Sequence, residues 1–201
     1  MAGAPLAFYF DFNSPYGYIG AHRITELAAK HGRAVDWKPI LLGAIFKVTG
    51  SGPLPDVPLK GDYSKRDFAR SAGFHGLPYR MPGEHPFSPV AASRAVYWAG
   101  ERSTDEARRL TLALYDAVWA QDRSIASPAA VAGIAGEAGF DAEAVAAALN
   151  EPAVKQRLMT EVEAAIEKGV FGSPFVIADG EPFWGVDRFE MLDKWLETGG
   201  W

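Results

Sequence analysis

The chain has 201 residues, 48% of them hydrophobic and 22% charged, which is typical of a soluble globular protein and argues against disorder. The formal net charge of −5, with lysine and arginine scattered among acids, argues against a nucleic-acid partner. There is no cysteine, so disulfides, thiolate metal sites and redox chemistry by the chain's own sulfur are excluded, and any reacting thiol must come from a bound molecule.

The first part of the chain predicts a strand, a helix and a second strand. Residues 6–12 form a short apolar and aromatic run, which indicates a strand buried on both faces. Apolar residues then recur at helical spacing from Tyr16 until Gly32 ends the helix, and residues 35–42 predict the next strand. Such a βαβ unit places its two strands side by side and parallel.

A long, mostly helical stretch follows. Residues 43–61 are rich in glycine and proline and predict a loop, with one helical turn at 44–47, before a short helix at 62–72. From Ser88 to Lys168 the sequence is alanine-rich, and its caps and stops agree with the periodicity of five helices. Four of these helices are expected to begin at Ser88, Thr104, Ser127 and Asp141, and the fifth to end at Gly169.

The C-terminal part returns to strands. Residues 173–178 predict a strand, Asp179-Gly180 a two-residue hairpin turn, and residues 181–184 the returning strand. A last helix is expected to begin at Asp187, whose carboxylate would cap it.

The order of these elements is βαβ, then a helical block, then ββα. This is the topology of an α/β thioredoxin-like domain with a large all-helical insertion. We therefore expect the thioredoxin-like domain to comprise residues 1–75 and 169–201, and the inserted helical domain to comprise residues 76–168.

The step from the first strand into the first helix, Asn13-Ser14-Pro15-Tyr16, is a candidate anion site. A helix that starts at Pro15 leaves its first backbone N–H groups unpaired beside Ser14, at the positive end of the helix dipole. Such a position stabilises a thiolate, a phosphate or a carboxylate. Ser-Pro is also an ordinary helix start with serine as the cap, so these residues alone are explained by capping.

Two separated motifs resemble those of DsbA-like thioredoxin proteins. Residues 10–16, Phe-Asp-Phe-Asn-Ser-Pro-Tyr, resemble the opening of members that carry serine in place of the first redox cysteine. Residues 169–175, Gly-Val-Phe-Gly-Ser-Pro-Phe, resemble the cis-proline loop of that superfamily. Further similar segments lie at residues 37–39, 43–47, 60–63 and 184–188. Over nearly its whole length the chain resembles the 2-hydroxychromene-2-carboxylate isomerase family, which is related to kappa-class glutathione transferases.

The resemblance implies a glutathione site at the first helix. Glutathione would lie across the thioredoxin-like domain, with its sulfur beside Pro15 and Tyr16 and with Ser14 donating a hydrogen bond to the thiolate. A serine cannot form a disulfide, but its hydroxyl and the neighbouring N–H groups lower the pKa of a bound thiol. Capping and thiolate stabilisation use the same geometry, so both roles are open to Ser14.

The resemblance also implies the other glutathione contacts. With Pro174 in the cis form, the backbone of Ser173 would pair with the cysteinyl backbone of glutathione, although the ordinary expectation for a proline is trans. The backbone of Val186 and the carboxylate of Asp187 would hold the γ-glutamyl end. At Ser51 the family usually has an asparagine that touches glutathione, and the shorter serine leaves that contact open.

The activity that the resemblance implies is glutathione-dependent isomerisation of a hydroxychromene carboxylate in aromatic-compound catabolism. The thiolate would add to the substrate, the ring would open, the freed bond would rotate, and elimination would release the thiol and trans-benzylidenepyruvate. Lys47 is expected to meet the substrate carboxylate with help from Arg80, while the plain alternative for Lys47 is a solvated surface lysine. The resemblance also suggests a homodimer.

Other classes of function are less well supported. The four histidines lack metal-ligand spacing, and neither a hydrolase elbow nor a phosphate-binding loop is present, so we expect no metal site. No segment could span a membrane, and the first residues lack a signal peptide, so we expect a cytoplasmic protein. Two alternatives remain: a kappa-like transferase that consumes glutathione, and a non-catalytic thioredoxin-fold binding protein.

Overall fold

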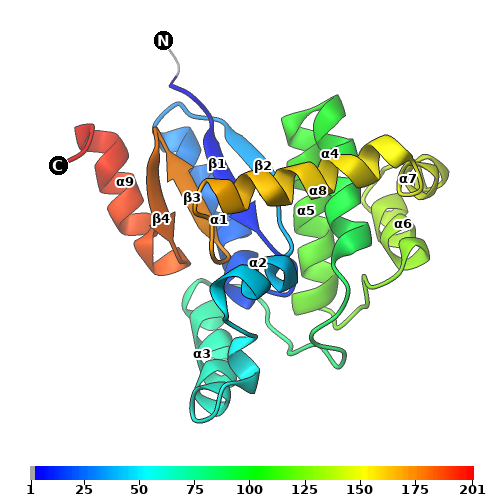
Figure 1. Ribbon diagram of the computed structural model, residues 1–201, viewed down its shortest axis with the longest axis horizontal. Helices are drawn as coiled ribbons and strands as arrows, with labels where there is room; N and C mark the ends of the chain where they lie inside the picture. Colours follow the sequence, from blue (N-terminus) through cyan, green and yellow to red (C-terminus); the bar gives the residue numbers. More distant parts are fainter. Residues whose placement is uncertain (1–2) are drawn as a thin grey trace.

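A computed structural model describes residues 3–201, which form a four-stranded mixed sheet flanked by helices (Figure 1). The strand order is β2-β1-β3-β4, in which β1 (Leu6–Phe10) runs parallel to β2 (Val35–Pro39). β3 (Phe175–Ala178) runs antiparallel to β1, and β4 (Glu181–Trp184) forms a hairpin with it. The predicted thioredoxin topology is therefore confirmed.

The helices follow the predicted order, with one joining the first two strands, seven between β2 and β3, and one after β4. They are α1 (Pro15–Lys30), α2 (Leu42–Thr49), α3 (Lys60–Phe74), α4 (Val90–Arg102), α5 (Thr104–Trp119), α6 (Pro128–Glu137), α7 (Ala142–Ala148), α8 (Pro152–Glu167) and α9 (Phe189–Thr198). Two 3-10 turns lie at Leu54–Asp56 and Val186–Arg188. The segment predicted as one helical turn at 44–47 is thus a complete short helix, α2.

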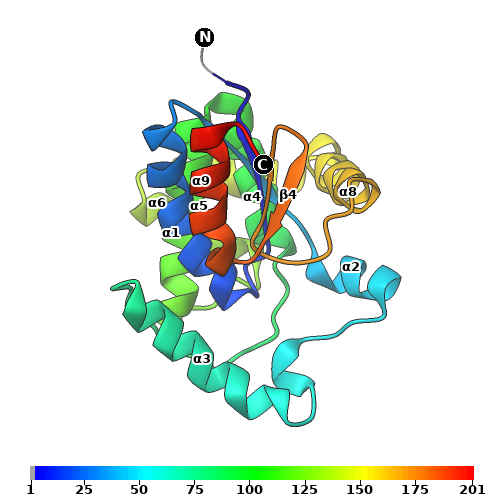
Figure 2. The same ribbon diagram turned by 90° about the vertical axis from the view of Figure 1, so that its left-hand side faces the viewer.

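The sheet is covered on both faces. Helices α1 and α9 lie on one face, while α8 crosses the other (Figures 1 and 2). The alternation of side chains along β1 explains this arrangement, because Phe8 and Phe10 belong to the large core that includes α1 and α5, whereas Tyr9 packs with Ala165 of α8. The first strand is therefore buried on both faces, as its composition predicted.

The predicted division into a thioredoxin-like domain and an inserted domain stays a prediction. Buried residues of β1, α1, α4, α5 and α6 form one continuous cluster. Helix α8, which belongs to the predicted insertion, also packs against the sheet. Within residues 3–201, no helix has both the length and the apolar character that a membrane span requires.

Some predicted helix starts are confirmed and others are shifted: α4 begins at Val90, two residues after the expected Ser88, and Pro89 before it offers no side-chain cap. Ser127 and Asp141 cap α6 and α7 through their side chains, whereas α5 is capped by Ser103, one residue before the expected Thr104. The predicted cap at Asp187 is wrong. A 3-10 turn precedes α9, and the Asp187 carboxylate pairs with the guanidinium of Arg188 at 2.9 Å instead of accepting from the helix start.

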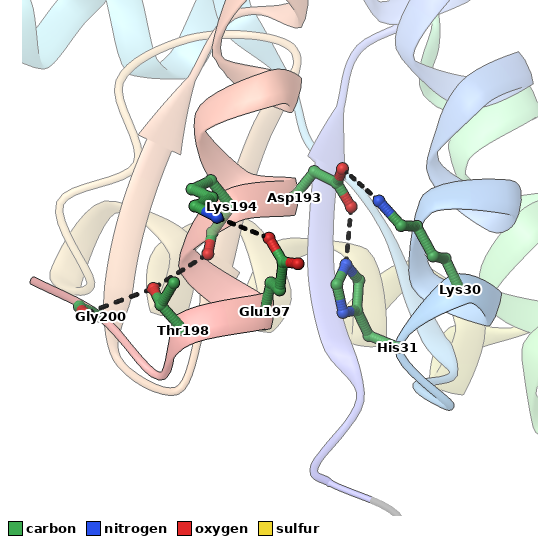
Figure 3. Close-up of polar contacts among 7 residues, drawn as sticks. All are labelled: Lys30, His31, Asp193, Lys194, Glu197, Thr198 and Gly200. Atoms are coloured by element: carbon green, nitrogen blue, oxygen red, sulfur yellow. Dashed lines mark hydrogen bonds and ion pairs between the residues drawn. The ribbon is translucent and has the colours of Figure 1, made fainter.

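Polar contacts also tie the end of α1 to the last helix (Figure 3). The Asp193 carboxylate on α9 accepts hydrogen bonds from Lys30 and His31, each at 2.6 Å. Lys30 is exposed, while the His31 side chain is mostly buried. This cluster fixes α9 beside α1 on the same face of the sheet.

Candidate functional site

A cleft of about 1480 Å³ opens at the carboxyl end of β1. The first turn of α1, one side of α2, residues 50–57, part of α3 and the loop before β3 line it. Eight of the ten predicted site residues lie on its walls: Ser14, Pro15, Tyr16, Lys47, Ser51, Ser173, Val186 and Asp187. A cleft of this size at the end of a strand, with convergent polar groups, is the usual form of a small-molecule site.

Ser14 joins the two predicted motifs directly. Its side chain is the cap of α1 and accepts a hydrogen bond from the Gly17 N–H at 3.0 Å. The same hydroxyl donates to the carbonyl oxygen of Ser173 at 2.8 Å. Ser14 is 6% exposed and lines the cleft. In this arrangement its proton is directed at the loop before β3, so donation to a bound sulfur requires the hydroxyl to turn.

The loop before β3 packs tightly against α1. The Ser173–Pro174 bond is cis, and the Ser173 hydroxyl accepts from the backbone N–H of Asp11 at 2.9 Å. A Cβ on Gly20 would lie 3.1 Å from Pro174, and one on Gly17 would lie 2.8 Å from the Ser173 hydroxyl. These two glycines therefore allow the close approach. Pro174 itself packs against the helix and does not line the cleft.

Two backbone donors at the cleft have no acceptor. Tyr16 and Ser173 both line it, and neither of their N–H groups donates a hydrogen bond to any of residues 3–201. One N–H lies at the start of α1, where the helix dipole is positive, and the other lies on the adjoining loop. This donor set suits an anion or an extended peptide backbone.

Side chains from the helical block hold the turn between β1 and α1. Tyr115 donates its hydroxyl to the Asp11 carbonyl, and the indole N–H of Trp119 donates to the Phe12 carbonyl, both at 2.9 Å. Burial raises the pKa of Tyr115 well above its ordinary value, so its hydroxyl stays a donor. Helix α5 thus fixes the turn that carries Ser14, two residues after Phe12.

A second set of contacts reaches the same turn from the segment before α4. The Asn13 side chain exchanges two hydrogen bonds with the backbone of Phe87, each of 3.0 Å, and His85 Nε2 lies 3.0 Å from the Asn13 carbonyl oxygen. His85 also lines the cleft, which the sequence did not reveal. His85, one of four histidines, carries no local signal in the sequence, because only the folding of the chain brings it to Asn13.

Asp67 is a further cleft residue that the sequence analysis missed. The Tyr16 hydroxyl donates to its carboxylate at 2.5 Å, and burial together with this bond raises the pKa of Tyr16 above its ordinary value. Tyr63 and Ser71 donate to the same carboxylate from within α3. Asp67 therefore connects α3 to the first turn of α1 across the cleft.

The charged residues of the cleft differ in their pairing. Lys47 and Lys60 are exposed, and neither forms an ion pair with any residue that the structure describes. Arg80 lies outside the cleft, where its guanidinium is 3.5 Å from the Asp122 carboxylate. This position does not test whether Arg80 assists substrate binding, and that role stays a prediction.

Two aromatic side chains stand at one end of the cleft. The rings of Phe171 and Trp184 pack edge to face with centroids 4.9 Å apart, and both are about half exposed. A Cβ on Gly172 would overlap the Trp184 indole, so this glycine is needed for the ring to lie against the loop. The pair is an apolar surface beside Ser173. Among residues 3–201, no three His, Asp or Glu side chains are grouped as a metal site requires.

Comparisons with known proteins agree with this geometry. The protein-family model of the DSBA-like thioredoxin domain matches residues 5–197 of this chain. A 2-hydroxychromene-2-carboxylate isomerase of Pseudomonas putida is 30% identical over 93% of this chain and 91% of its own length. Glutathione S-transferase kappa 1 of Rattus norvegicus is 26% identical over 98% of this chain and 95% of its own length. A solved structure of 2-hydroxychromene-2-carboxylate isomerase superposes with a TM-score of 0.85 at 29% identity, covering 96% of this chain and 94% of that one.

Proposed function

The chain belongs to the DsbA-like thioredoxin domain family and, within it, to the 2-hydroxychromene-2-carboxylate isomerase family, and from this membership we propose that it is a glutathione-dependent isomerase. Its substrate would be 2-hydroxychromene-2-carboxylate or a close analogue, and its product trans-o-hydroxybenzylidenepyruvate. One observation carries the proposal. Ser14 at the start of α1 is bonded to Ser173 in a cleft where the N–H groups of Tyr16 and Ser173 have no acceptor among residues 3–201, and the chain has no cysteine.

The residues present fit glutathione. The N–H of Ser173 would pair with the peptide backbone of its cysteinyl residue, and the N–H of Tyr16 would face the sulfur. Val186 and Asp187 would hold the γ-glutamyl end, and Ser51 is placed on the opposite wall. When bound, glutathione supplies a thiolate nucleophile that adds reversibly to the conjugated substrate and is regenerated in each turnover.

Ser14 and the start of α1 would stabilise the thiolate form. The hydroxyl can turn from the Ser173 carbonyl toward a sulfur anion, because an anion is a stronger acceptor than a neutral carbonyl. The free N–H of Tyr16 and the helix dipole act in the same direction. Together these groups lower the pKa of a bound thiol without a cysteine of the protein's own.

The remaining walls suit an aromatic carboxylate. Lys47 is an exposed cation without a partner among the described residues, and so is available to the carboxylate. Phe171 and Trp184 offer an apolar surface for an aromatic ring. We expect Lys47→Ala to raise the KM for the substrate about tenfold and to change kcat little, since an exposed ion pair contributes mainly to binding.

The test is turnover of 2-hydroxychromene-2-carboxylate with and without glutathione, with both product and total glutathione measured. An isomerase forms product only when glutathione is present and leaves its total amount unchanged. Product formation that is independent of glutathione would contradict the proposal.

A transferase is the second candidate, because kappa-class enzymes match nearly the whole chain. In that reaction the thiolate attacks an electrophile and stays attached, so glutathione is consumed in proportion to product. The same assay separates the two reactions. If neither isomerisation nor conjugation is detected but glutathione still binds, a binding protein without catalytic activity is the remaining alternative.

A homodimer, a cytoplasmic location and a role in aromatic-compound catabolism also belong to this proposal. Light scattering of the purified protein measures its mass in solution directly. A mass of one chain at micromolar concentration would contradict the homodimer.

A further inference from the structure

Asp11 is a buried carboxylate at the floor of the cleft, and the function proposed above gives it no role. It follows the last residue of β1, is 1% exposed and lines the cleft. One carboxylate oxygen accepts from the backbone N–H of Asn13 at 2.7 Å and from the Asn13 side-chain amide at 3.2 Å. The other accepts from the backbone N–H of Leu42 at 2.7 Å. A buried charge needs such partners, and Asp11 has three donors.

The bond to Leu42 caps α2 from another element. The residue at the cap position of α2 is Leu41, which has no side-chain acceptor, and the first N–H of the helix is that of Leu42. Helix starts are normally completed by a serine, threonine, asparagine or aspartate at the cap itself. Here the acceptor comes from the end of β1, 31 residues earlier in the chain, and brings a negative charge to the positive end of the helix dipole.

The backbone of Asp11 is bonded to the other side of the site. Its N–H donates to the Ser173 hydroxyl at 2.9 Å, and its carbonyl accepts from the Ser14 N–H and the Tyr115 hydroxyl, both at 2.9 Å. A single residue therefore contacts the start of α1, the loop before β3, α5 and α2. Through its backbone it holds Ser14, and through its side chain it holds the helix that carries Lys47.

The pKa of the Asp11 carboxyl is raised above its ordinary value, although its hydrogen bonds oppose the effect of burial. Burial raises the pKa of its carboxyl, while hydrogen bonds from Asn13 and Leu42 and the nearby His85 oppose that rise. The ionised carboxylate can accept from all three donors at once, whereas an amide in its place has only one oxygen.

We propose that Asp11 is a positioning residue that caps α2 from across the cleft and so holds Lys47 at a fixed place relative to Ser14. The role toward substrate rests on the proposed function, whereas the capping role does not. Without the Asp11 side chain, α2 keeps only the apolar contacts of the buried Ile45 and of the partly buried Leu42 and Ala44. Lys47 would then lose its fixed position while the backbone contacts of Ser14 remain.

The first experiment measures amide hydrogen exchange in Asp11→Asn. The first turn of α2, at Leu42, Ala44 and Ile45, is expected to exchange at least about fivefold faster, because asparagine leaves one of the N–H donors without an acceptor. Asp141→Asn is the matched control, since Asp141 caps α7 away from the cleft through the Glu143 and Ala144 N–H groups. It should leave exchange in α2 unchanged. Unchanged exchange of α2 in folded Asp11→Asn would overturn the proposal.

The second experiment is a double-mutant cycle between Asp11 and Lys47, read from the KM for the substrate carboxylate. Asp11→Asn and Lys47→Ala are each expected to raise KM about tenfold, and the double variant no further, because both remove the same contact. Asp141→Asn should leave KM unchanged. Additive effects of the two substitutions would overturn the positioning role.

A second variant covers the case in which Asp11→Asn does not fold. Leu42→Pro removes the N–H that donates to Asp11 and replaces the leucine side chain, which packs beside Ile45, with an apolar ring. Proline is favoured at the first position of a helix. Leu42→Pro is expected to raise KM as Asp11→Asn does. In combination with Lys47→Ala it should raise KM no further. An unchanged KM in Leu42→Pro would overturn the proposal. If the wild type has no turnover, the proposed function fails, while hydrogen exchange still decides whether Asp11 caps α2.

Discussion

The two walls of the cleft are built differently. The wall at Ser14 is formed by residues 11–16 and 171–174 (the anchored wall). Its two segments are bonded to each other, and it is bonded to α5 and to the segment before α4. The opposite wall is formed by α2, residues 50–57 and α3 (the open wall), and it is largely exposed. Helix α2 buries only Ile45, and Leu59 before α3 is 98% exposed. Figure 2 shows α3 extending away from the sheet.

This difference assigns different tasks to the two walls. A reacting sulfur must be held within a fraction of an ångström, and the anchored wall provides a fixed turn with defined donors. Binding of a substrate tolerates adjustment, and exposed segments with few buried contacts provide it. We therefore expect substitutions on the anchored wall to affect the chemical step and stability, and those on the open wall to affect KM.

The largest effect is expected for Ser14→Ala. The loss of the Ser14 hydroxyl should lower kcat about 10²-fold, the size seen when one donor to a developing anion is removed. Ser127→Ala is the matched control, since Ser127 also precedes a proline and caps its helix, α6, far from the cleft. It should reduce stability by about 1 kcal/mol and leave kcat unchanged. Equal kcat in both variants would mean that Ser14 is only a cap.

A pair of glycine substitutions compares the packing of the two walls. In Gly17→Ala the new Cβ would lie 2.5 Å from the Tyr115 hydroxyl and 2.8 Å from that of Ser173, so we expect a loss of about 1–3 kcal/mol in the free energy of unfolding. In Gly43→Ala on α2 nothing lies within 4 Å, and alanine favours the helix, so stability should rise by up to about 1 kcal/mol. Urea denaturation measures both. A destabilised Gly43→Ala would show that the open wall is packed more tightly than described.

The hydrogen bond between Tyr16 and Asp67 connects the two walls directly. Tyr16→Phe removes it but leaves Asp67 bonded to Tyr63 and Ser71. We expect the free energy of unfolding to fall by about 1–2 kcal/mol, as for the loss of a hydrogen bond to a charged group. Amide hydrogen exchange in α3 should become faster. Unchanged exchange in α3 would mean that its position does not depend on the anchored wall.

A smaller effect is expected from the cluster in Figure 3, which lies outside the cleft. Lys30 and His31 hold the pKa of Asp193 below its ordinary value, so the folded state favours the carboxylate. This stabilisation is present above about pH 4, the ordinary pKa of aspartate, and is lost as the pH falls through the lower pKa of the folded state. Because the cluster is partly solvent-exposed, Asp193→Asn should lower the free energy of unfolding by less than about 1 kcal/mol at pH 7, and by progressively less as the pH falls below about 4. A constant difference across that range would contradict the assignment.

The sequence predicts the anchored wall better than the open wall. Strand order and many helix starts follow from local patterns of apolar residues, caps and turns. The resemblance to a known family predicts that Ser14 and Ser173 belong to one site. Asp67 and His85 were missed because they reach the cleft only through the packing of α3 and the segment before α4. The position of Arg80 outside the cleft likewise depends on the packing of the segment before α4. The predicted Asp187 cap is wrong because the neighbouring Arg188 pairs with its carboxylate. A pattern of cap residues does not show such a pairing.

The central claim is that the anchored wall lowers the pKa of a thiol that it does not itself contain. The most direct test is a pH titration of glutathione bound to the wild-type protein, in which the thiolate is followed by its ultraviolet absorbance and compared with free glutathione. The account predicts a lower apparent pKa for bound glutathione than for free glutathione, and a shift back toward the free value in Ser14→Ala but not in Ser127→Ala. A bound thiol with the pKa of free glutathione would contradict it.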